Sequence, residues 1–222
     1  MKLLCPVKKC VWGAIDNLDN LKNYIAKSGQ FFGQDLSGPA SNYNPSYPSN
    51  QTLYQYMGWG THQGLDIPVS TGTEVFASHD GVVVKLSDSL TAGIGVVIEG
   101  VDIRTVYWHL KEYNVVIGQS IKMGEKIALS DNTGYSGGPH LHWEYKIKDG
   151  NDYKAVDPLP YVVFKKPMDK ELVSRIVSKL YQTWLQDEPD AIKYWSELID
   201  KPEILENLLD QKIKDIKQAV NK

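Results

Sequence analysis

Between residues 65 and 147, short runs rich in β-branched residues alternate with turns that contain glycine. Runs of this length and spacing are typical of antiparallel β-structure and are too short for helices of ordinary length. Six runs are expected to form strands: 74–77, 81–86, 95–99, 104–108, 126–129 and 141–145. The sequence therefore predicts a mainly β fold built from antiparallel sheets.

Four of the five histidines occur in three short phrases within or next to these runs. The phrases are His-Gln-Gly-Leu-Asp at 62–66, Trp-His-Leu at 108–110 and Pro-His-Leu-His-Trp-Glu at 139–144. Catalytic zinc takes three imidazole or carboxylate ligands and keeps a fourth position for water. His62, Asp66 and His142 can supply such a set, and His109 and His140 remain to transfer protons. The pattern indicates a zinc-dependent hydrolase.

The spacing within the phrases separates the roles of the residues. His140 and His142 are two apart on an expected strand, so both face the same side, with Cα atoms about 6.6 Å apart. Leu141 then points into the core. His62 and Asp66 would lie roughly 13 Å apart in a fully extended strand. We expect the intervening Gly64 to adopt positive φ and curve the chain so that these two ligands converge.

Each phrase also has a simpler explanation when it is taken alone. His109 follows an aromatic run and is equally compatible with a packed strand residue. The spacing of His62 and Asp66 arises by chance in many chains. The three phrases in this order are what favour a metal site. His79 precedes an Asp-Gly pair, so we expect it at a hairpin outside the site.

The order His-x-Gly-x-Asp, Tyr-x-His-Leu and Gly-x-Pro-His-Leu-His-x-Glu resembles the lysostaphin-type zinc endopeptidases, which cut peptidoglycan cross-links. The likeness runs from about residue 30 to residue 161. It includes the stretches 68–77, 80–83, 118–121, 132–138 and 156–161. The resemblance implies one zinc ion bound by His62, Asp66 and His142. It makes His140 and His109 the proton-handling pair beside the attacked carbonyl.

Two further residues keep alternative interpretations. The family has a tyrosine shortly before the first ligand that is proposed to support the oxyanion, and Tyr56 matches this place. Tyr54 is a rival, and a packing role is as compatible with either tyrosine. Glu144 stands two residues after His142 on the expected strand. It is either a hydrogen-bonding partner of the ligand or a charge on the strand face, and we favour a structural role.

The predicted function is a zinc metalloendopeptidase that hydrolyses amide bonds in peptidoglycan cross-links. Zinc lowers the pKa of bound water and polarises the scissile carbonyl. His140 or His109 would take the proton from water and return it to the leaving amine. The alternative is a non-catalytic wall-binding protein, virion component or hydrolase activator on the same fold. The bond itself stays open between a Gly-Gly bridge and a D-alanyl link to a diamino acid.

Three regions lie outside the predicted sheet. Residues 11–27 carry apolar residues at helical spacing and end at Gly29, which predicts a core-facing helix, and 6–8 are expected to form the first strand. Residues 37–51 predict a long loop that either walls a substrate groove or lies in solvent. Three amphipathic segments after residue 166 predict a small helical bundle of undecided role. We therefore expect a metallopeptidase domain at 1–166 and a helical domain at 167–222.

Composition restricts the partners. The net charge of −3 gives no basic face for nucleic acid, and no run of 18 apolar residues exists to span a membrane. Two cysteines, expected to be reduced, are too few for a four-cysteine zinc site. The first residues have no signal-peptide pattern. A phage-borne enzyme, released by lysis as an endolysin or carried in a virion, is our hypothesis for reaching the cell wall. Oligomeric state is left open.

Overall fold

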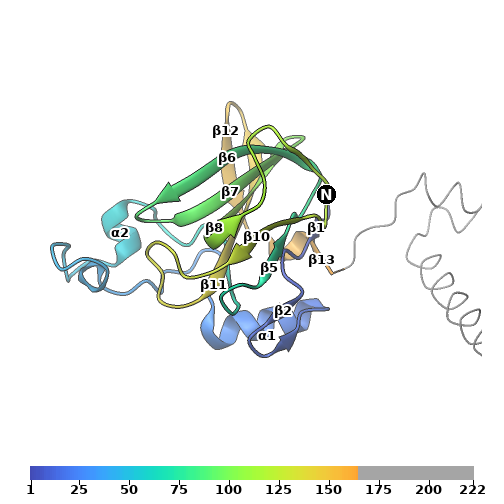
Figure 1. Cartoon of the computed structure of the whole chain (residues 1–222). Coiled ribbons are helices and arrows are strands. Elements are labelled where there is room, and N and C mark those ends of the chain that lie inside the picture. The colour runs from blue at the N-terminus through green and yellow to red at the C-terminus, as the bar shows by residue number, and fades with distance from the viewer. Residues whose placement is uncertain (165–222) are drawn as a thin grey trace, which may run out of the picture. The chain divides into compact units, whose positions relative to one another are not determined.

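The computed structural model describes residues 1–164 (Figure 1). The chain divides into two units, Met1–Lys166 and Pro167–Lys222. The first contains all the elements given below. The helical bundle predicted at 167–222 lies outside the described residues and stays a prediction.

One large sheet of nine strands dominates the described residues. Its main path runs in the order β12-β11-β8-β7-β6-β9, with β10 beside β5 and β8 and with β4 beside β11. Neighbouring strands in it are antiparallel, as predicted. Its strands are β4 (Leu65–Pro68), β5 (Glu74–Phe76), β6 (Gly81–Ser89), β7 (Gly93–Gly100), β8 (Ile103–Tyr113), β9 (Ser120–Ile121), β10 (Lys126–Ser130), β11 (His140–Asp149) and β12 (Asp152–Val156).

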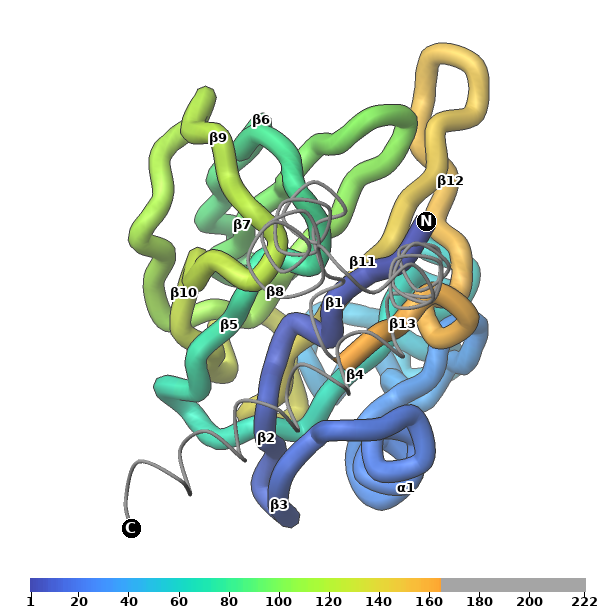
Figure 2. The backbone as a smooth tube through the Cα atoms, turned by 90° about the vertical axis from the view of Figure 1, so that its right-hand side faces the viewer, coloured from blue at the N-terminus to red at the C-terminus, as the bar shows by residue number. Residues whose placement is uncertain are grey.

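Each of the six predicted runs overlaps one of these strands, so the mainly β fold is confirmed. The strand β11 is central because it pairs with β8 along one edge and with β4 and then β12 along the other (Figure 2). Its residues alternate as predicted: Leu141 and Trp143 are fully buried, whereas His140 and His142 face the opposite side. Burial of an aromatic side chain of this size contributes about 2–3 kcal/mol to folding. The same strand thus anchors the core and presents the two histidines.

The N-terminal region differs from the sequence-based expectation. The first strand, β1 (Leu3–Leu4), pairs in parallel with β13 (Val162–Val163), and residues 6–8 form no strand. The first part of the predicted helix is instead a small hairpin of β2 (Lys9–Cys10) and β3 (Gly13–Ala14). Gly13 has a φ of +143°, a value that a helix does not accept.

The helix α1 (Leu18–Ser28) begins only after this hairpin. Asn17 caps it, because its side-chain oxygen accepts a hydrogen bond from the Asn20 amide. Leu21 and Ile25, one turn apart, are its buried residues. The helix ends at Gly29, as the sequence predicts.

The segment 37–51 is mostly irregular, with one short 3-10 turn, η1 (Ala40–Asn42). It leads into α2 (Leu53–Met57), which begins at Thr52 with a reciprocal capping box to Gln55. Figure 1 shows this part of the chain projecting to one side of the sheet. A second 3-10 turn, η2 (Leu159–Tyr161), precedes β13.

The hairpin predicted at His79 is wrong. The turn at 77–80 joins β5 to β6, but β5 pairs with β10 and β6 pairs with β7 and β9. His79 is buried, with its Nδ1 2.8 Å from the Asp80 carbonyl oxygen and its Nε2 3.0 Å from Thr105 Oγ1. It is therefore a packed residue outside the histidine cluster, as expected. Among the described residues, no helix is long and apolar enough to cross a membrane.

Candidate metal centre

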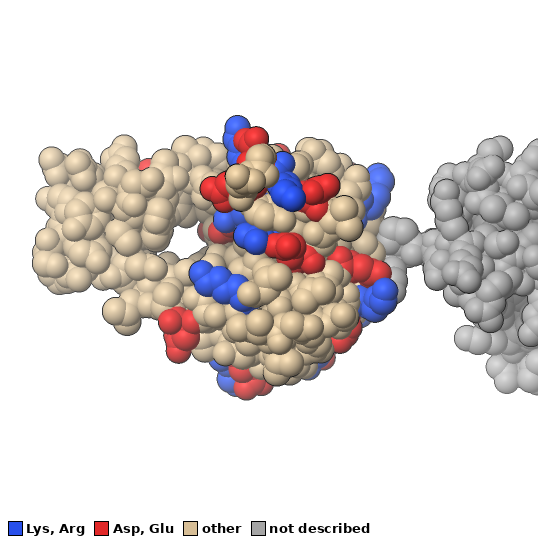
Figure 3. All heavy atoms as spheres, turned by 90° about the horizontal axis from the view of Figure 1, so that it is seen from above, with Lys and Arg blue, Asp and Glu red and all other residues tan. Residues whose placement is uncertain are grey.

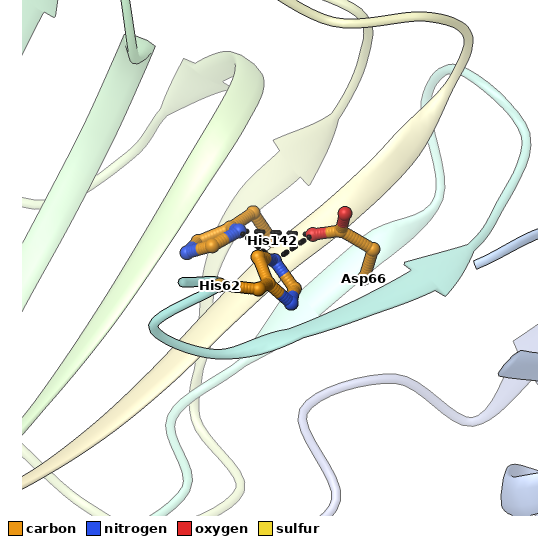
Figure 4. Close-up of side chains that lie close together, drawn as sticks. All are labelled: His62, Asp66 and His142. Atoms are coloured by element: carbon orange, nitrogen blue, oxygen red, sulfur yellow. Dashed lines mark hydrogen bonds and ion pairs between the residues drawn. The ribbon is translucent and has the colours of Figure 1, made fainter. Parts of the chain in front are cut away.

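The structure brings His62, Asp66 and His142 together at one end of β4 and β11 (Figure 4). In the antiparallel register of these two strands, His142 lies directly opposite Asp66. His62 comes from the turn that precedes β4. Its backbone is fixed by hydrogen bonds between its amide and Gln34 O and between its carbonyl and the Gly33 amide. Two adjacent strands and one tethered turn therefore position the three side chains.

Gly64 permits this turn, but for a reason other than the predicted one. It is not among the glycines with positive φ. A Cβ atom at Gly64 would lie 2.4 Å from the Trp143 carbonyl oxygen, well inside contact distance. The chain between His62 and Asp66 thus passes directly against β11. Close approach of two backbones, and not a left-handed residue, brings the two ligands together.

The three candidate ligand atoms form a nearly equilateral triangle. His62 Nε2 lies 2.9 Å from Asp66 Oδ1 and 2.9 Å from His142 Nδ1, and His142 Nδ1 lies 2.9 Å from Asp66 Oδ1. His62 is buried, and the side chains of Asp66 and His142 are about one-seventh exposed or less. Ligand atoms from two imidazoles and one carboxylate therefore converge on one point at the surface of a cleft.

The outer nitrogens fix which ring nitrogens carry lone pairs. His62 Nδ1 lies 3.0 Å from the Phe31 carbonyl oxygen, and His142 Nε2 lies 3.2 Å from Glu144 Oε1. Because both partners only accept, both outer nitrogens donate when the rings are neutral. The inward nitrogens then carry lone pairs aimed at each other and at a carboxylate oxygen. A cation relieves this repulsion, so the residues fit a metal ion with two nitrogen ligands and one oxygen ligand.

Electrostatics around the triangle agree with this fit. Burial alone would raise the pKa of Asp66, but hydrogen bonds from the three surrounding histidines outweigh it and hold the pKa well below its ordinary value. Burial would likewise lower the pKa of His142, but hydrogen bonds to Asp66 and Glu144 raise it to about 9. The site therefore favours positive charge at its centre, from a proton or from a metal.

His140 and His109 lie beside the triangle. His140 Nδ1 is 2.8 Å from the Gly138 carbonyl oxygen, and its Nε2 is 3.4 Å from Asp66 Oδ1. His109 Nδ1 is 2.6 Å from the Thr133 carbonyl oxygen, and the two rings lie 4.6 Å apart between centroids. In each ring the Nδ1 proton is committed to a carbonyl oxygen, which leaves Nε2 as the atom that can exchange protons.

His109 is held in an unusual backbone conformation, with φ of +59°. Such values are uncommon outside glycine and need support from the surrounding structure. Burial lowers the pKa of His109 to about 3, and the neighbouring His140 and His142 add to this effect. In this arrangement His109 is neutral at physiological pH, and its Nε2 is a hydrogen-bond acceptor.

Comparison with known proteins identifies the domain. Residues 60–158 match the model of peptidase family M23. The chain carries a peptidase M23 domain. The five site residues predicted from the histidine phrases lie inside the matched range, and so does Glu144.

Curated relatives match only over part of their length. Over 117 residues the chain is 40% identical to the peptidoglycan DD-endopeptidase ShyA of Vibrio cholerae, covering 51% of this chain and 27% of the relative. Over 106 residues it is 36% identical to lysostaphin of Staphylococcus simulans, and the match covers 46% of this chain and 22% of the relative. An uncharacterised metalloprotease of Haemophilus influenzae is 47% identical over 100 residues, and the match covers 44% of this chain and 20% of the relative. The chain thus spans about a fifth to a quarter of the length of these relatives.

A similar solved structure is the catalytic domain of lysostaphin from Staphylococcus simulans. It is 31% identical, with a TM-score of 0.45, and the match covers 66% of this chain and 98% of that one.

The candidate metal centre of the M23 domain opens into a cleft of about 700 Å³. One wall comes from the segment 36–59, including Ser37 and Tyr43, so this predicted loop does border a groove. The opposite wall is the glycine-rich loop 135–139. Three of the four clustered histidines, His109, His140 and His142, face this cleft.

The structure treats the two candidate tyrosines differently. Tyr54 lines the cleft, and its ring stacks on that of His62, with centroids 6.1 Å apart and planes 13° apart. Tyr56, the residue favoured by spacing, is 42% exposed and packs on Tyr47 at 4.6 Å between centroids. The structure does not place Tyr56 among the residues that line the cleft. One helical turn cannot direct residues 54 and 56 to the same side, so only one of them faces the ligands.

Glu144 contacts a candidate ligand directly. Its Oε1 accepts from His142 Nε2 at 3.2 Å and from Trp108 Nε1 at 3.3 Å, while its Oε2 pairs with Lys146 Nζ at 2.7 Å. Hydrogen bonds from His142 and the charge of Lys146 lower the pKa of Glu144 to about 2, although burial acts in the opposite direction. Of the two interpretations left open by the sequence, the contacts support a partner of the ligand. The contribution of Trp108 was not predicted, because it depends on the register between β8 and β11.

Proposed function

We propose that the M23 domain is a zinc-dependent endopeptidase that hydrolyses amide bonds in peptidoglycan cross-links. The observation that carries the proposal is the triangle of His62, Asp66 and His142 with two further imidazole nitrogens beside it. Metal-assisted hydrolysis needs both parts, namely a ligand set with an open side and a group that transfers protons next to it. The family match and the curated relative named as a peptidoglycan DD-endopeptidase support the substrate class.

The donor set favours zinc. Two imidazole nitrogens and one carboxylate oxygen form a ligand set found in catalytic zinc sites, whereas magnesium and calcium prefer oxygen ligands alone. A zinc ion bound there would acidify a water molecule and polarise the scissile carbonyl.

The protein's own residues then divide the remaining work. Asp66 and the two ligand histidines are oriented by Phe31 O, Glu144 and the β4–β11 register, so the structure holds them together before a metal binds. His140 Nε2 or His109 Nε2 would accept the proton of the attacking water, because the Nδ1 proton of each ring is held by a carbonyl oxygen, that of Gly138 or Thr133. The same nitrogen would then return this proton to the leaving amine. This shared role of the pair is part of the proposal.

Tyr54 is our candidate for supporting the oxyanion. Its ring stacks on His62 and it lines the cleft, whereas Tyr56 packs on Tyr47. Burial raises the pKa of Tyr54 well above its ordinary value, with further contributions from nearby carboxylates, so its hydroxyl keeps its proton and remains a donor.

The test combines metal analysis with the products of wall digestion. The purified chain is expected to contain about one zinc per molecule, to lose activity on chelation and to regain it with zinc. Mass spectrometry of fragments from purified walls of different cross-link types should show newly cleaved amide bonds within the cross-links. Asp66→Asn should abolish both zinc binding and cleavage. Full activity after exhaustive chelation would contradict the proposal. Zinc binding without cleavage of any wall would favour the non-catalytic alternative. The phage-borne route to the wall stays a prediction.

A further inference from the structure

The cleft beside the metal centre contains carboxylates but no basic side chain. Asp66 and Glu144 are among the described residues that line it, and no lysine or arginine is. Lys146 lies nearby on β11, but its ammonium group pairs with Glu144 Oε2 at 2.7 Å, so its charge is already compensated. Within the described residues, a negatively charged substrate group that enters the cleft therefore finds no lysine or arginine in the lining with which to form an ion pair.

The wall formed by the projecting segment is also uncharged. Residues 36–65 contain no Asp, Glu, Lys or Arg, although these make up 23% of the chain. The lobe that carries α2 accordingly shows almost no charged atoms on the face seen in Figure 3. The carboxylate of Asp35 stands at the start of this lobe, hydrogen-bonded to Ser37 and Thr52. Burial raises the pKa of Tyr43 in the lobe, and the charges of Asp35 and Asp66 add to it, so this wall disfavours negative charge.

The two walls contact each other at one place, so a peptide bound in the cleft is flanked by both. Tyr47 of the lobe and Tyr135 of the opposite loop bring their hydroxyl oxygens to 3.1 Å, and Tyr43 packs on Tyr135 with ring centroids 5.9 Å apart. In Figure 3 a gap separates the lobe from the rest of the domain and is bounded on both sides by contacting atoms. A group held between these walls loses much of its contact with bulk water. Desolvation of a charged group is costly unless a partner of opposite charge replaces the water.

Peptidoglycan cross-links differ in charge next to the bond that is cut. A link to a diamino diacid leaves a carboxylate on the carbon attached to the scissile nitrogen. A glycine bridge has none there, and amidation of the diacid removes it. Resting on the function proposed above, we propose that the enzyme selects cross-links with no free carboxylate beside the scissile amide. The cleft, which has two carboxylates but no lysine or arginine in its lining and is bordered by an uncharged wall, is the specificity device, and neutral tyrosine hydroxyls and backbone groups replace ion pairs in holding the substrate.

Two synthetic cross-linked peptides that differ only at this carboxyl test the inference. One carries the free carboxylate next to the scissile amide nitrogen, and the other carries the carboxamide. The full-length, zinc-loaded chain should cleave the carboxamide with a kcat/KM higher by about tenfold or more, because an unpaired desolvated charge is strongly disfavoured. Equal rates, or faster cleavage of the carboxylate, would overturn the inference while leaving the proposed endopeptidase activity intact. Cleavage of neither peptide, together with no products from any wall, would instead refute the proposed function and this inference with it.

A positive charge added to the cleft tests whether the lack of basic side chains causes the substrate preference. Thr61 lines the cleft and is exposed, and its side chain is outside the metal centre. Thr61→Lys should raise kcat/KM for the carboxylate peptide relative to the carboxamide, narrowing the preference several-fold. Thr61→Gln, of similar length but neutral, should leave the preference as in the wild type. A preference that is unchanged by lysine, or changed equally by glutamine, would show that charge is not what the cleft selects.

Discussion

Replacement of Glu144 by glutamine should weaken zinc binding, although Glu144 is not expected to touch the metal. Its Oε1 accepts the hydrogen bond from His142 Nε2, which fixes the ring so that Nδ1 faces the other ligands. Partners of this kind also make the ligand nitrogen a better donor, and their loss typically costs about 10–100-fold in metal affinity. Glutamine keeps the size and removes the charge. We therefore expect a loss in this range.

The same substitution has an opposing effect that depends on pH. Glu144 helps to raise the pKa of His142 to about 9, and a proton on His142 competes with the metal. At pH 7 only about one His142 ring in a hundred is neutral in the metal-free protein, which weakens apparent zinc affinity by roughly 100-fold from its high-pH limit. Removing Glu144 lowers this pKa and reduces the competition. The loss caused by Glu144→Gln should therefore be largest near pH 9 and smaller at pH 7.

Zinc affinity measured by competition with a chromophoric chelator at pH 7 and pH 9 checks both effects. Glu99→Gln is the matched control, because Glu99 is also an ion-paired carboxylate on a strand but pairs with Arg104, outside the candidate metal centre. Its zinc affinity should equal that of the wild type. Wild-type affinity in Glu144→Gln at pH 9 would refute the positioning role. A loss that grows as pH falls would refute the assigned competition with the proton.

Three further substitutions address separate parts of the site. His140→Ala should keep zinc but lose about 10²–10⁴-fold in rate, whereas His142→Ala should lose the metal; zinc analysis beside a peptide assay distinguishes them. Gly64→Ala should lower the free energy of unfolding by about 1–3 kcal/mol in denaturant titrations, because its new Cβ would lie 2.4 Å from a carbonyl oxygen of β11. Tyr54→Phe should lower kcat by about 10²-fold or more, whereas Tyr56→Phe should stay near the wild-type rate.

The contrary results are equally specific. Loss of zinc in the His140 variant with retention in the His142 variant would reverse the two roles. Gly137→Ala is the control for Gly64→Ala, because no atom lies within 4 Å of a Cβ placed there, and equal destabilisation would remove the close-approach argument. A slow Tyr56→Phe beside a normal Tyr54→Phe would restore the assignment made from spacing alone.

Local patterns predicted those features that depend on local geometry. The six β runs and the shared face of His140 and His142 follow from the two-residue period of a strand, which holds in any sheet. The predicted helix at 11–27 was wrong in its first half, although Trp12 and Ile15 continue the apolar spacing of α1. A periodic pattern does not show where a helix begins. That was decided by Gly13, whose backbone turns the hairpin, and by the cap at Asn17.

Features that depend on contacts distant in sequence were not accessible in the same way. The role of Gly64 was misjudged because the residue is constrained by the backbone of Trp143. Trp143 is 79 positions further along the chain, but the pairing of β4 with β11 brings it next to Gly64. Spacing favoured Tyr56 and left Tyr54 as a rival, although the two are only two positions apart. Their difference arises from the orientation of α2, which directs one ring to His62 and the other to Tyr47.

The cleft shows how one sequence feature acquires meaning only in the fold. An uncharged stretch at 36–65 is, by sequence, compatible with an ordinary polar loop. In the structure this stretch forms the wall that faces the imidazole pair, and Tyr47 joins it to Tyr135 across the cleft. The absence of charged side chains there disfavours a substrate carboxylate, because the two walls displace water from the bound peptide and offer no ion pair in its place. The same composition on an open surface would select for nothing, since solvent would screen and hydrate any carboxylate. Specificity in this domain is thus expected to depend on the contact between the two walls, and variants that separate Tyr47 from Tyr135 should relax it.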